Sequence, residues 1–276
     1  MPPLIDIAHV WRAGELAHLA QPGGASVETI STGYAALSRV LPGGGWPRGA
    51  MTEVLQAQSG QHEWGLVAPA LSALQAALPN SWVVLVGAPY CPFGPALGAR
   101  QINMARLLSI NAAAKADNPA ALWATREALQ CADVCAVLAW LPDARSAHLR
   151  RLQIAALSAN KLLFVFRPLK AHHDSSPAPL RLKLAGTAYT AAHNLQIDVF
   201  KRRGPPLAAP VLIDTRPPRL AALLAASCQR MHQHEPVPVH EPVPVPVHEP
   251  VPELIDLSDI LRKPLYALDR TASLQH

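Results

Sequence analysis

Residues 51–78 read MTEVLQAQSGQHEWGLVAPALSALQAAL and combine three kinds of segment. Met51–Leu55 is apolar and typical of a strand, Gln56–Glu63 is a polar loop, and Trp64–Leu78 is an Ala- and Leu-rich helix that ends before Pro79. A strand, a loop and a helix in this order form the unit that cradles nucleotide phosphates in parallel α/β proteins. The stretch therefore predicts an α/β fold with a candidate phosphate loop.

The same alternation of strand and helix continues along the chain. Uninterrupted apolar runs predict buried strands, and the runs between them predict helices. The strands are expected at Trp82–Val86, Val134–Leu141 and Lys161–Phe166, and the helices at Ala120–Cys131 and Arg145–Ala159. After Pro168 the pattern changes, because Leu180–Leu184 and Leu195–Phe200 alternate with period two, as edge or antiparallel strands do. We expect a mostly parallel central sheet with helices on both faces.

Composition narrows the class of protein. The chain has 276 residues, of which 50% are hydrophobic, so it has enough apolar side chains to bury a core. Its net charge of +5 is a mild basic excess, compatible with a nucleic acid or an acidic partner. The sequence contains no leader and no apolar run near 20 residues, so we expect a cytoplasmic protein with no membrane contact. Cys131 and Cys135 lie in an apolar segment and are interpreted as buried thiols, with no metal site.

The candidate phosphate loop lacks the residues that handle phosphate. The motif GxxxxGK[ST] needs a Lys to neutralise the anion and a hydroxyl to hold Mg²⁺. This loop has one glycine and no Lys, and Glu63 stands where the hydroxyl is needed and would repel phosphate. His62 is mostly uncharged at neutral pH. The degenerate position comprises Gln56, Ser59, Gly60, Gln61, His62 and Glu63.

A second required element of such a site, an acidic residue, is also missing. A Walker-B strand ends in an Asp that serves Mg²⁺. In Val134–Leu141 Trp140 lies near that position, and Asp143 follows Pro142 past the expected strand end. Both losses argue against ATP hydrolysis, so we expect no enzymatic activity and no cofactor.

Several motifs together resemble a known family. Ile30–Gly33, Leu41–Gly49 and Thr52–Val54 resemble the start of the RecA core, before its phosphate loop. A closer similarity is to the ImuA family, which is RecA-like and associated with translesion DNA synthesis, and to its relatives among the SulA cell-division inhibitors. It covers about residues 27–220 and rests on Leu41–Gly49, Val137–Pro142, Leu149–Gln153, Phe164–Pro168, Pro179–Leu182 and Lys201–Gly204.

The resemblance implies a RecA-like fold and a non-catalytic adaptor in the SOS-induced translesion synthesis mutasome at damaged DNA. The implied partner is ImuB, an inactive Y-family polymerase homologue, with RecA and an error-prone DNA polymerase as further candidates. Two alternatives stay open: a divergent RecA-type ATPase acting on single-stranded DNA, and a SulA-like inhibitor that binds FtsZ. The length and the amino-terminal helix favour the ImuA branch.

Basic residues after the third buried strand form a candidate contact with nucleic acid or a partner. They are Arg167, Arg181, Lys183, Lys201, Arg202 and Arg203. A solvated strand end is an equal interpretation. The segment Leu169–Ser176 lies where RecA carries its DNA-binding loop, but it has one Lys and no aromatic residue for base stacking. Direct DNA contact is therefore left open.

The termini extend beyond the α/β domain. We expect a helix in residues 1–24, the RecA-like domain in 25–231, a Pro-rich repeat linker in 232–253 and an apolar motif in 254–276. The repeat His-Glu-Pro-Val-Pro begins at residues 234, 240 and 248 and favours an extended spacer. The motif has the apolar spacing of a groove-binding peptide and docks either on a partner or on its own domain. Its candidate docking residues are Leu254, Leu257, Ile260 and Leu261.

Overall fold

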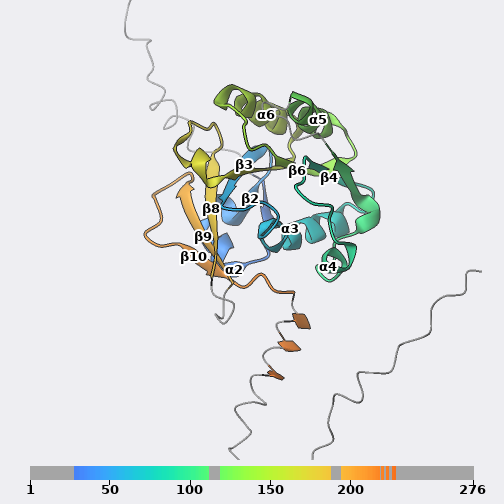
Figure 1. Ribbon diagram of the computed structural model, residues 1–276, viewed down its shortest axis with the longest axis vertical. Coiled ribbons are helices and arrows are strands. Elements are labelled where there is room, and N and C mark those ends of the chain that lie inside the picture. Colours follow the sequence, from blue (N-terminus) through green and yellow to red (C-terminus); the bar gives the residue numbers. More distant parts are fainter. Residues whose placement is uncertain are drawn as a thin grey trace, which may run out of the picture. The chain divides into compact units, whose positions relative to one another are not determined.

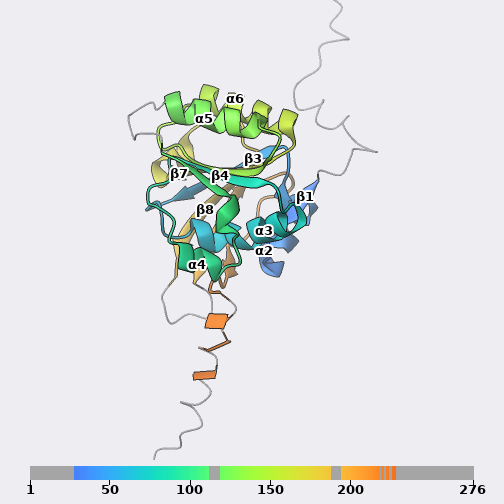
Figure 2. The same cartoon turned by 90° about the vertical axis from the view of Figure 1, so that its right-hand side faces the viewer.

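The computed structural model describes residues 28–111, 119–187 and 194–217, together with 219–220, 222–223 and 226–227. Within these residues the main sheet lies between two layers of helices (Figure 1). One layer holds α2 (Ala35–Val40), α3 (Glu63–Ala77) and α4 (Gly94–Gly98), and the other holds α5 (Pro119–Gln130) and α6 (Ser146–Ala159). The view in Figure 2 shows the sheet between them.

The main sheet has eight strands in the described residues, in the order β10-β9-β8-β3-β7-β6-β4-β5. Their bounds are β3 (Ala50–Gln56), β4 (Trp82–Val86), β5 (Leu107–Ile110), β6 (Val134–Trp140), β7 (Leu162–Pro168), β8 (Leu180–Gly186), β9 (Leu195–Lys201) and β10 (Val211–Ile213). From β8 to β5 all neighbours are parallel, whereas β9 is antiparallel to both β8 and β10. The expected α/β fold with a mostly parallel sheet and helices on both faces is confirmed.

A second, two-stranded sheet pairs β1 (Thr29–Ser31) with β2 (Gly45–Pro47) in antiparallel register. Three short 3₁₀ helices complete the described elements: Pro42–Gly44, Met104–Arg106 and Leu169–His173. The last of these lies within Leu169–Ser176, the segment that was compared with the DNA-binding loop of RecA. The chain divides into two units, Met1–Ala225 and Ala226–His276, and all the named helices and strands belong to the first.

The strand patterns follow from which faces are covered. All seven residues of β6 are buried, as expected for a parallel strand under helices on both faces. In β9 buried residues alternate with half-buried ones, because one of its faces is partly open to solvent. β8 lies between the parallel and the antiparallel parts of the sheet, because it is parallel to β3 on one side and antiparallel to β9 on the other.

Two apolar cores lie on opposite faces of the sheet. Phe164 and Phe166 of β7 belong to the core under α2 and α3, where Phe164 meets Trp46 edge-to-face with ring centroids 5.2 Å apart. Leu163 and Val165 of the same strand belong to the core under α5 and α6. One strand therefore supports both layers through its period-two alternation.

Some expectations are corrected and others fall on residues outside the described ranges. Cys131 is exposed, so its interpretation as a buried thiol is wrong, whereas Cys135 is buried. Cys131 follows the last residue of α5 and Cys135 lies inside β6, which explains the difference. The segment 1–24, the linker 232–253 and the motif 254–276 lie outside the described residues. None of the described helices is long and apolar enough to cross a membrane.

Candidate functional site

The loop singled out by the sequence joins β3 to α3 at the carboxyl edge of the sheet. β3, β7, β6 and β4 are parallel, so their carboxyl ends meet at this edge. Open parallel α/β sheets bind their ligands outside these ends. Gln56 is the last residue of β3, and Glu63 is the first residue of α3, one residue earlier than expected.

The carboxylate of Glu63 is turned back onto this loop. The residue is only 1% exposed. Its Oε1 accepts a hydrogen bond from the backbone N–H of Gly60 at 2.6 Å, and its Oε2 accepts one from the backbone N–H of His62 at 3.0 Å. Backbone N–H groups before a helix are the donors that a phosphate loop offers to its anion. In this chain the protein's own carboxylate takes two of them.

The same carboxylate is bonded to the ends of two strands. Oε1 of Glu63 also accepts hydrogen bonds from Gln56 Nε2 at 2.5 Å and from Trp140 Nε1 at 3.0 Å. Three of the four donors therefore converge on Oε1, and Oε2 accepts the fourth. The buried donor groups of Gln56 and Trp140 thus find their acceptor within the protein.

The contact between Glu63 and Trp140 joins the two positions that were compared by sequence with the Mg²⁺-binding elements of P-loop NTPases. In P-loop NTPases the loop hydroxyl and the Walker-B Asp hold the same Mg²⁺. Here Glu63 occupies the hydroxyl position and Trp140, the last residue of β6, lies near the Asp position. A carboxylate accepts directly from an indole N–H, so a hydrogen bond connects the two elements. The ring of Trp140 is further held by stacking on Phe166, with centroids 4.8 Å apart.

The remaining residues of the loop contact protein or solvent. Gly60 has φ +92°, which favours glycine, and a Cβ built there would lie 2.5 Å from Tyr90 Cδ2. The ring of Tyr90 therefore covers the loop at that point. His62, where the Lys is missing, packs against Gly186 at the end of β8, since a Cβ there would lie 3.1 Å from the imidazole. Ser59 and Gln61 are exposed.

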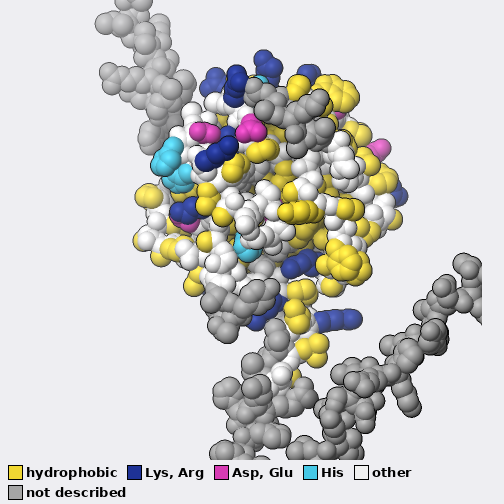
Figure 3. Space-filling view, viewed as in Figure 1, with side chains coloured by type: hydrophobic (Ala, Val, Ile, Leu, Met, Phe, Trp, Pro, Cys, Tyr) yellow, Lys and Arg dark blue, Asp and Glu magenta, His cyan; other side chains and the backbone are white. Residues whose placement is uncertain are grey.

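A cleft of about 810 Å³ opens beside this loop. Its walls come from the loop and the start of α3, from the segment between Ala88 and Arg100 after β4, and from Thr215–Pro217 and Leu220 after β10. Tyr90 and Phe93 project from the wall after β4 and are 71% and 70% exposed. In Figure 3 hydrophobic side chains lie beside Lys and Arg side chains in the region of α4. We call this space the carboxyl-edge cleft.

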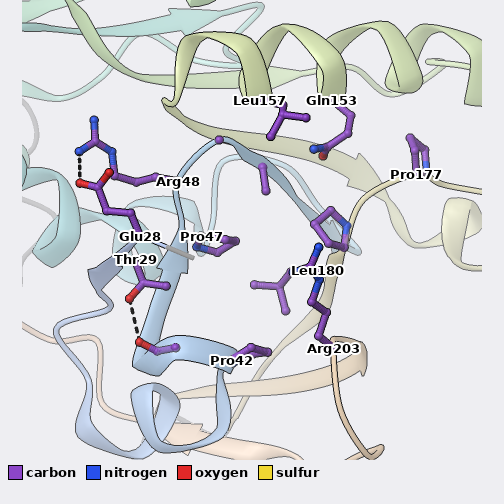
Figure 4. Close-up of a pocket in the computed structure, with 14 residues that line it drawn as sticks. Glu28, Thr29, Pro42, Pro47, Arg48, Gln153, Leu157, Pro177, Leu180 and Arg203 are labelled. Carbon is purple, nitrogen blue, oxygen red and sulfur yellow. Dashed lines mark hydrogen bonds and ion pairs between the residues drawn. The ribbon is translucent and has the colours of Figure 1, made fainter. Parts of the chain in front are cut away.

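A second cavity of about 730 Å³ lies at the opposite edge of the sheet, where β3 and β8 begin (Figure 4). Leu157 and Gln153 of α6 face Pro47 and Leu180 across it. Gln153 is already engaged, since its Oε1 accepts the backbone N–H of Met51 at 2.8 Å. The cavity is largely apolar, and we call it the amino-edge cavity.

The predicted basic group is divided by the structure. Arg167 and Arg181 are buried and lie on either side of the fully buried Glu53. Arg167 Nη1 contacts Glu53 Oε1 at 2.8 Å, and Arg181 Nε contacts Glu53 Oε2 at 2.6 Å. Arg167 also pairs with Asp174 at 2.9 Å. These two guanidinium groups hold β3, β7 and β8 together and are not exposed for a phosphate contact.

The other four basic residues lie nearer the surface but do not form one group. Lys183 pairs with Asp198 at 3.0 Å across β8 and β9. Lys201 donates to the carbonyl of Ser176, and Arg202 donates to the carbonyls of Pro205 and Val40. Arg203 is exposed and lines the amino-edge cavity. The docking residues Leu254, Leu257, Ile260 and Leu261 lie outside the described ranges.

The cleft also contains residues that sequence reasoning did not select. Tyr90 and Phe93 lie in a Pro- and Gly-rich segment without a recognised motif, and Arg100 belongs to no motif. The available signal was two aromatic residues in a loop directly after a buried strand, since loops at that sheet edge carry ligand contacts. Among the described residues no group of three or more His, Cys, Asp or Glu is placed to hold a metal ion.

No protein-family model matches the chain, and no match to a curated protein was found. Any functional assignment therefore rests on the residues and their geometry.

Proposed function

We propose that this protein is a non-catalytic, RecA-like adaptor of the SOS-induced translesion synthesis mutasome. In this role it binds ImuB, the inactive Y-family polymerase homologue, and bridges it to further partners. These are RecA and an error-prone polymerase. The ordered motifs that resemble the ImuA family support the proposal. So does the α/β architecture, in which a loop and helix follow the central parallel strand β3.

The observation that carries the non-catalytic part is the contact of Glu63 with its own loop. Phosphoryl transfer depends almost entirely on positioning and on cationic stabilisation of the phosphates. The loop offers no Lys, and a buried carboxylate bonded to Gly60, His62 and Trp140 occupies the donors. A phosphate group entering there would have to displace a like charge from four hydrogen bonds. The same observation speaks against the alternative of a divergent RecA-type ATPase.

The first test measures ATP hydrolysis by the purified full chain, with Mg²⁺, in the presence and absence of single-stranded DNA. We expect no turnover above the buffer control. Mg²⁺-dependent turnover that disappears in His62→Ala would refute the non-catalytic assignment.

The second test compares capture of purified ImuB, RecA and FtsZ by the immobilised full chain. An adaptor of the mutasome retains ImuB, and retention of FtsZ alone would instead support the SulA-like alternative. If the chain retains neither ImuB nor RecA, the proposed role is wrong.

A further inference from the structure

The carboxyl-edge cleft exposes two aromatic side chains on a short segment. Tyr90 and Phe93 stand three residues apart between β4 and α4, and each leaves about seven-tenths of its surface open. The ring of Tyr90 rests on Gly60, so this segment is in contact with the loop that Glu63 holds. Exposed aromatic rings beside a cleft are typical of the anchoring positions of protein interfaces. Solvent exposure of both rings has an energetic cost that a bound apolar partner would remove.

A cation without a carboxylate partner lies in the same cleft. Arg100 lines it and is half-buried, and its Nη1 donates to the backbone carbonyl of Thr215 at 2.7 Å. In the part of the chain that the structure describes, no carboxylate lies within ion-pairing distance of Arg100. Burial lowers the pKa of its guanidinium, but an arginine remains charged at neutral pH. A partly desolvated charge of this kind favours an anionic group brought in by a partner.

We propose that the carboxyl-edge cleft binds a segment of a protein partner that carries a carboxylate next to apolar side chains. Arg100 receives the carboxylate, and Tyr90 and Phe93 receive the apolar side chains. The inference rests on the proposed adaptor function and assigns a surface to it. The Glu63 contacts connect the loop that lines this cleft to β3 and β6.

A protein segment fits the cleft better than a nucleic acid does. A single-stranded nucleic acid needs a row of cations that follows its phosphates. The other arginine of the cleft, Arg216, is paired with Asp214 at 2.6 Å, so Arg100 is the one arginine here whose charge no described carboxylate offsets. One such cation between aromatic rings matches a single acidic side chain.

The experiment measures the affinity of the full chain for purified ImuB by fluorescence anisotropy. Phe93→Ser is expected to weaken binding about tenfold, and Tyr90→Ser with Phe93→Ser more than tenfold. Arg100→Gln is expected to weaken binding about tenfold, whereas Arg100→Lys keeps part of the affinity because it keeps the charge. Circular dichroism and urea unfolding establish that each variant is folded. Phe93 is exposed, so its variant remains informative if Arg100→Gln is destabilised.

Two exposed apolar residues elsewhere serve as matched controls. Trp123 on α5 is 65% exposed, and Leu157 at the amino-edge cavity is 67% exposed. Trp123→Ser and Leu157→Ser should bind ImuB like the unaltered chain. If Leu157→Ser loses binding while the Tyr90 and Phe93 variants keep it, the cleft assignment is overturned and the adaptor function stands. If the unaltered chain does not bind ImuB, both the function and the inference fail.

Binding of a labelled oligonucleotide of 20 thymidines tests the alternative that the cleft binds a single-stranded nucleic acid. The cleft assignment predicts that Phe93→Ser leaves any binding of this probe unchanged. If the variant loses the oligonucleotide and keeps ImuB, the cleft is a nucleic-acid site and the proposal is overturned.

Discussion

Glu63 stands at the start of α3 with its carboxylate bonded to four donors. Two come from the loop backbone at Gly60 and His62, and two come from the side chains of Gln56 and Trp140. A carboxylate at this end of a helix is also favoured by the helix dipole. Its four contacts connect the loop to the ends of β3 and β6.

Replacing this carboxylate should therefore be costly. Glu63→Ala leaves several buried donors without an acceptor, and each unsatisfied buried group costs about 1–3 kcal/mol. Because water can reach some of these donors, we expect the free energy of unfolding in urea to fall by about 2–4 kcal/mol. Glu127→Ala on α5 is the control, with an expected change within about 0.5 kcal/mol. Equal losses in both variants would show that the Glu63 contacts do not stabilise the fold.

Tyr34 gives the protein a pH dependence at the alkaline end. Its hydroxyl donates to the carbonyl of Gly65 in α3, and burial raises the pKa of Tyr34 to about 12, from an ordinary value of 10.0. Between these values the folded chain keeps a proton that the unfolded chain has lost, so stability present below pH 10 declines as the pH rises toward 12.

Urea unfolding at pH 9 and pH 11 checks this expectation. The decrease between the two should be smaller in Tyr34→Phe, which has no phenol to titrate at this position. An identical decrease in both proteins would mean that Tyr34 makes no contribution to it.

At the scale of elements, β3, β7 and β8 are joined by a buried charge network as well as by backbone hydrogen bonds. Glu53 of β3 lies between Arg167 of β7 and Arg181 of β8, and Arg181 also lies over the ring of Phe200 in β9 at 4.8 Å. Buried ion pairs add little net stability, but breaking one leaves an uncompensated charge. The stability of these three strands is therefore sensitive to the loss of a single charged residue of the network.

Glu53→Ala should lower the free energy of unfolding by about 3–5 kcal/mol, because it leaves two buried guanidinium groups without their carboxylate. The control is Asp198→Ala, which removes the partner of Lys183 in a pair whose side chains are about 40% exposed. An exposed pair is worth about 0–1 kcal/mol. Urea unfolding of both variants decides the matter, and a small effect at Glu53 would contradict the role given to the network.

At the scale of the whole molecule, the sheet couples two apolar cores. Leu163 and Phe164 are neighbours in β7, yet one faces the layer of α5 and α6 and the other faces the layer of α2 and α3. Each core is covered only while the sheet between them persists. We therefore expect the two layers to lose their structure together.

Leu163→Ala and Phe164→Ala test this coupling. Large-to-small changes at buried sites cost about 2–5 kcal/mol. Both variants should unfold in a single transition at a lower urea concentration, with circular dichroism and tryptophan fluorescence giving the same midpoint. Two separated transitions in either variant would show that the layers are independent.

The sequence alone determined the class of fold and the order of its longer strands and helices. Trp82–Val86 was predicted with the bounds that the structure has, and the period-two run from Leu195 was recognised as a strand with one wetter face. These predictions succeed because hydrophobic periodicity depends on neighbours along the chain. The loss of Lys from the loop was visible for the same reason.

Only the tertiary structure decided what the charged and aromatic residues do. The sequence indicates only that Glu63 is a charge that would repel phosphate. The fold brings to it a hydrogen-bond donor, the indole N–H of Trp140, which lies 77 positions away in the sequence. Arg167 and Arg181 read as a surface patch until the strands placed Glu53 between them. Tyr90 and Phe93 became candidate binding residues only because the structure places them, exposed, in the wall of the cleft. Such roles depend on which distant segments meet, and that is set by the packing of the whole chain.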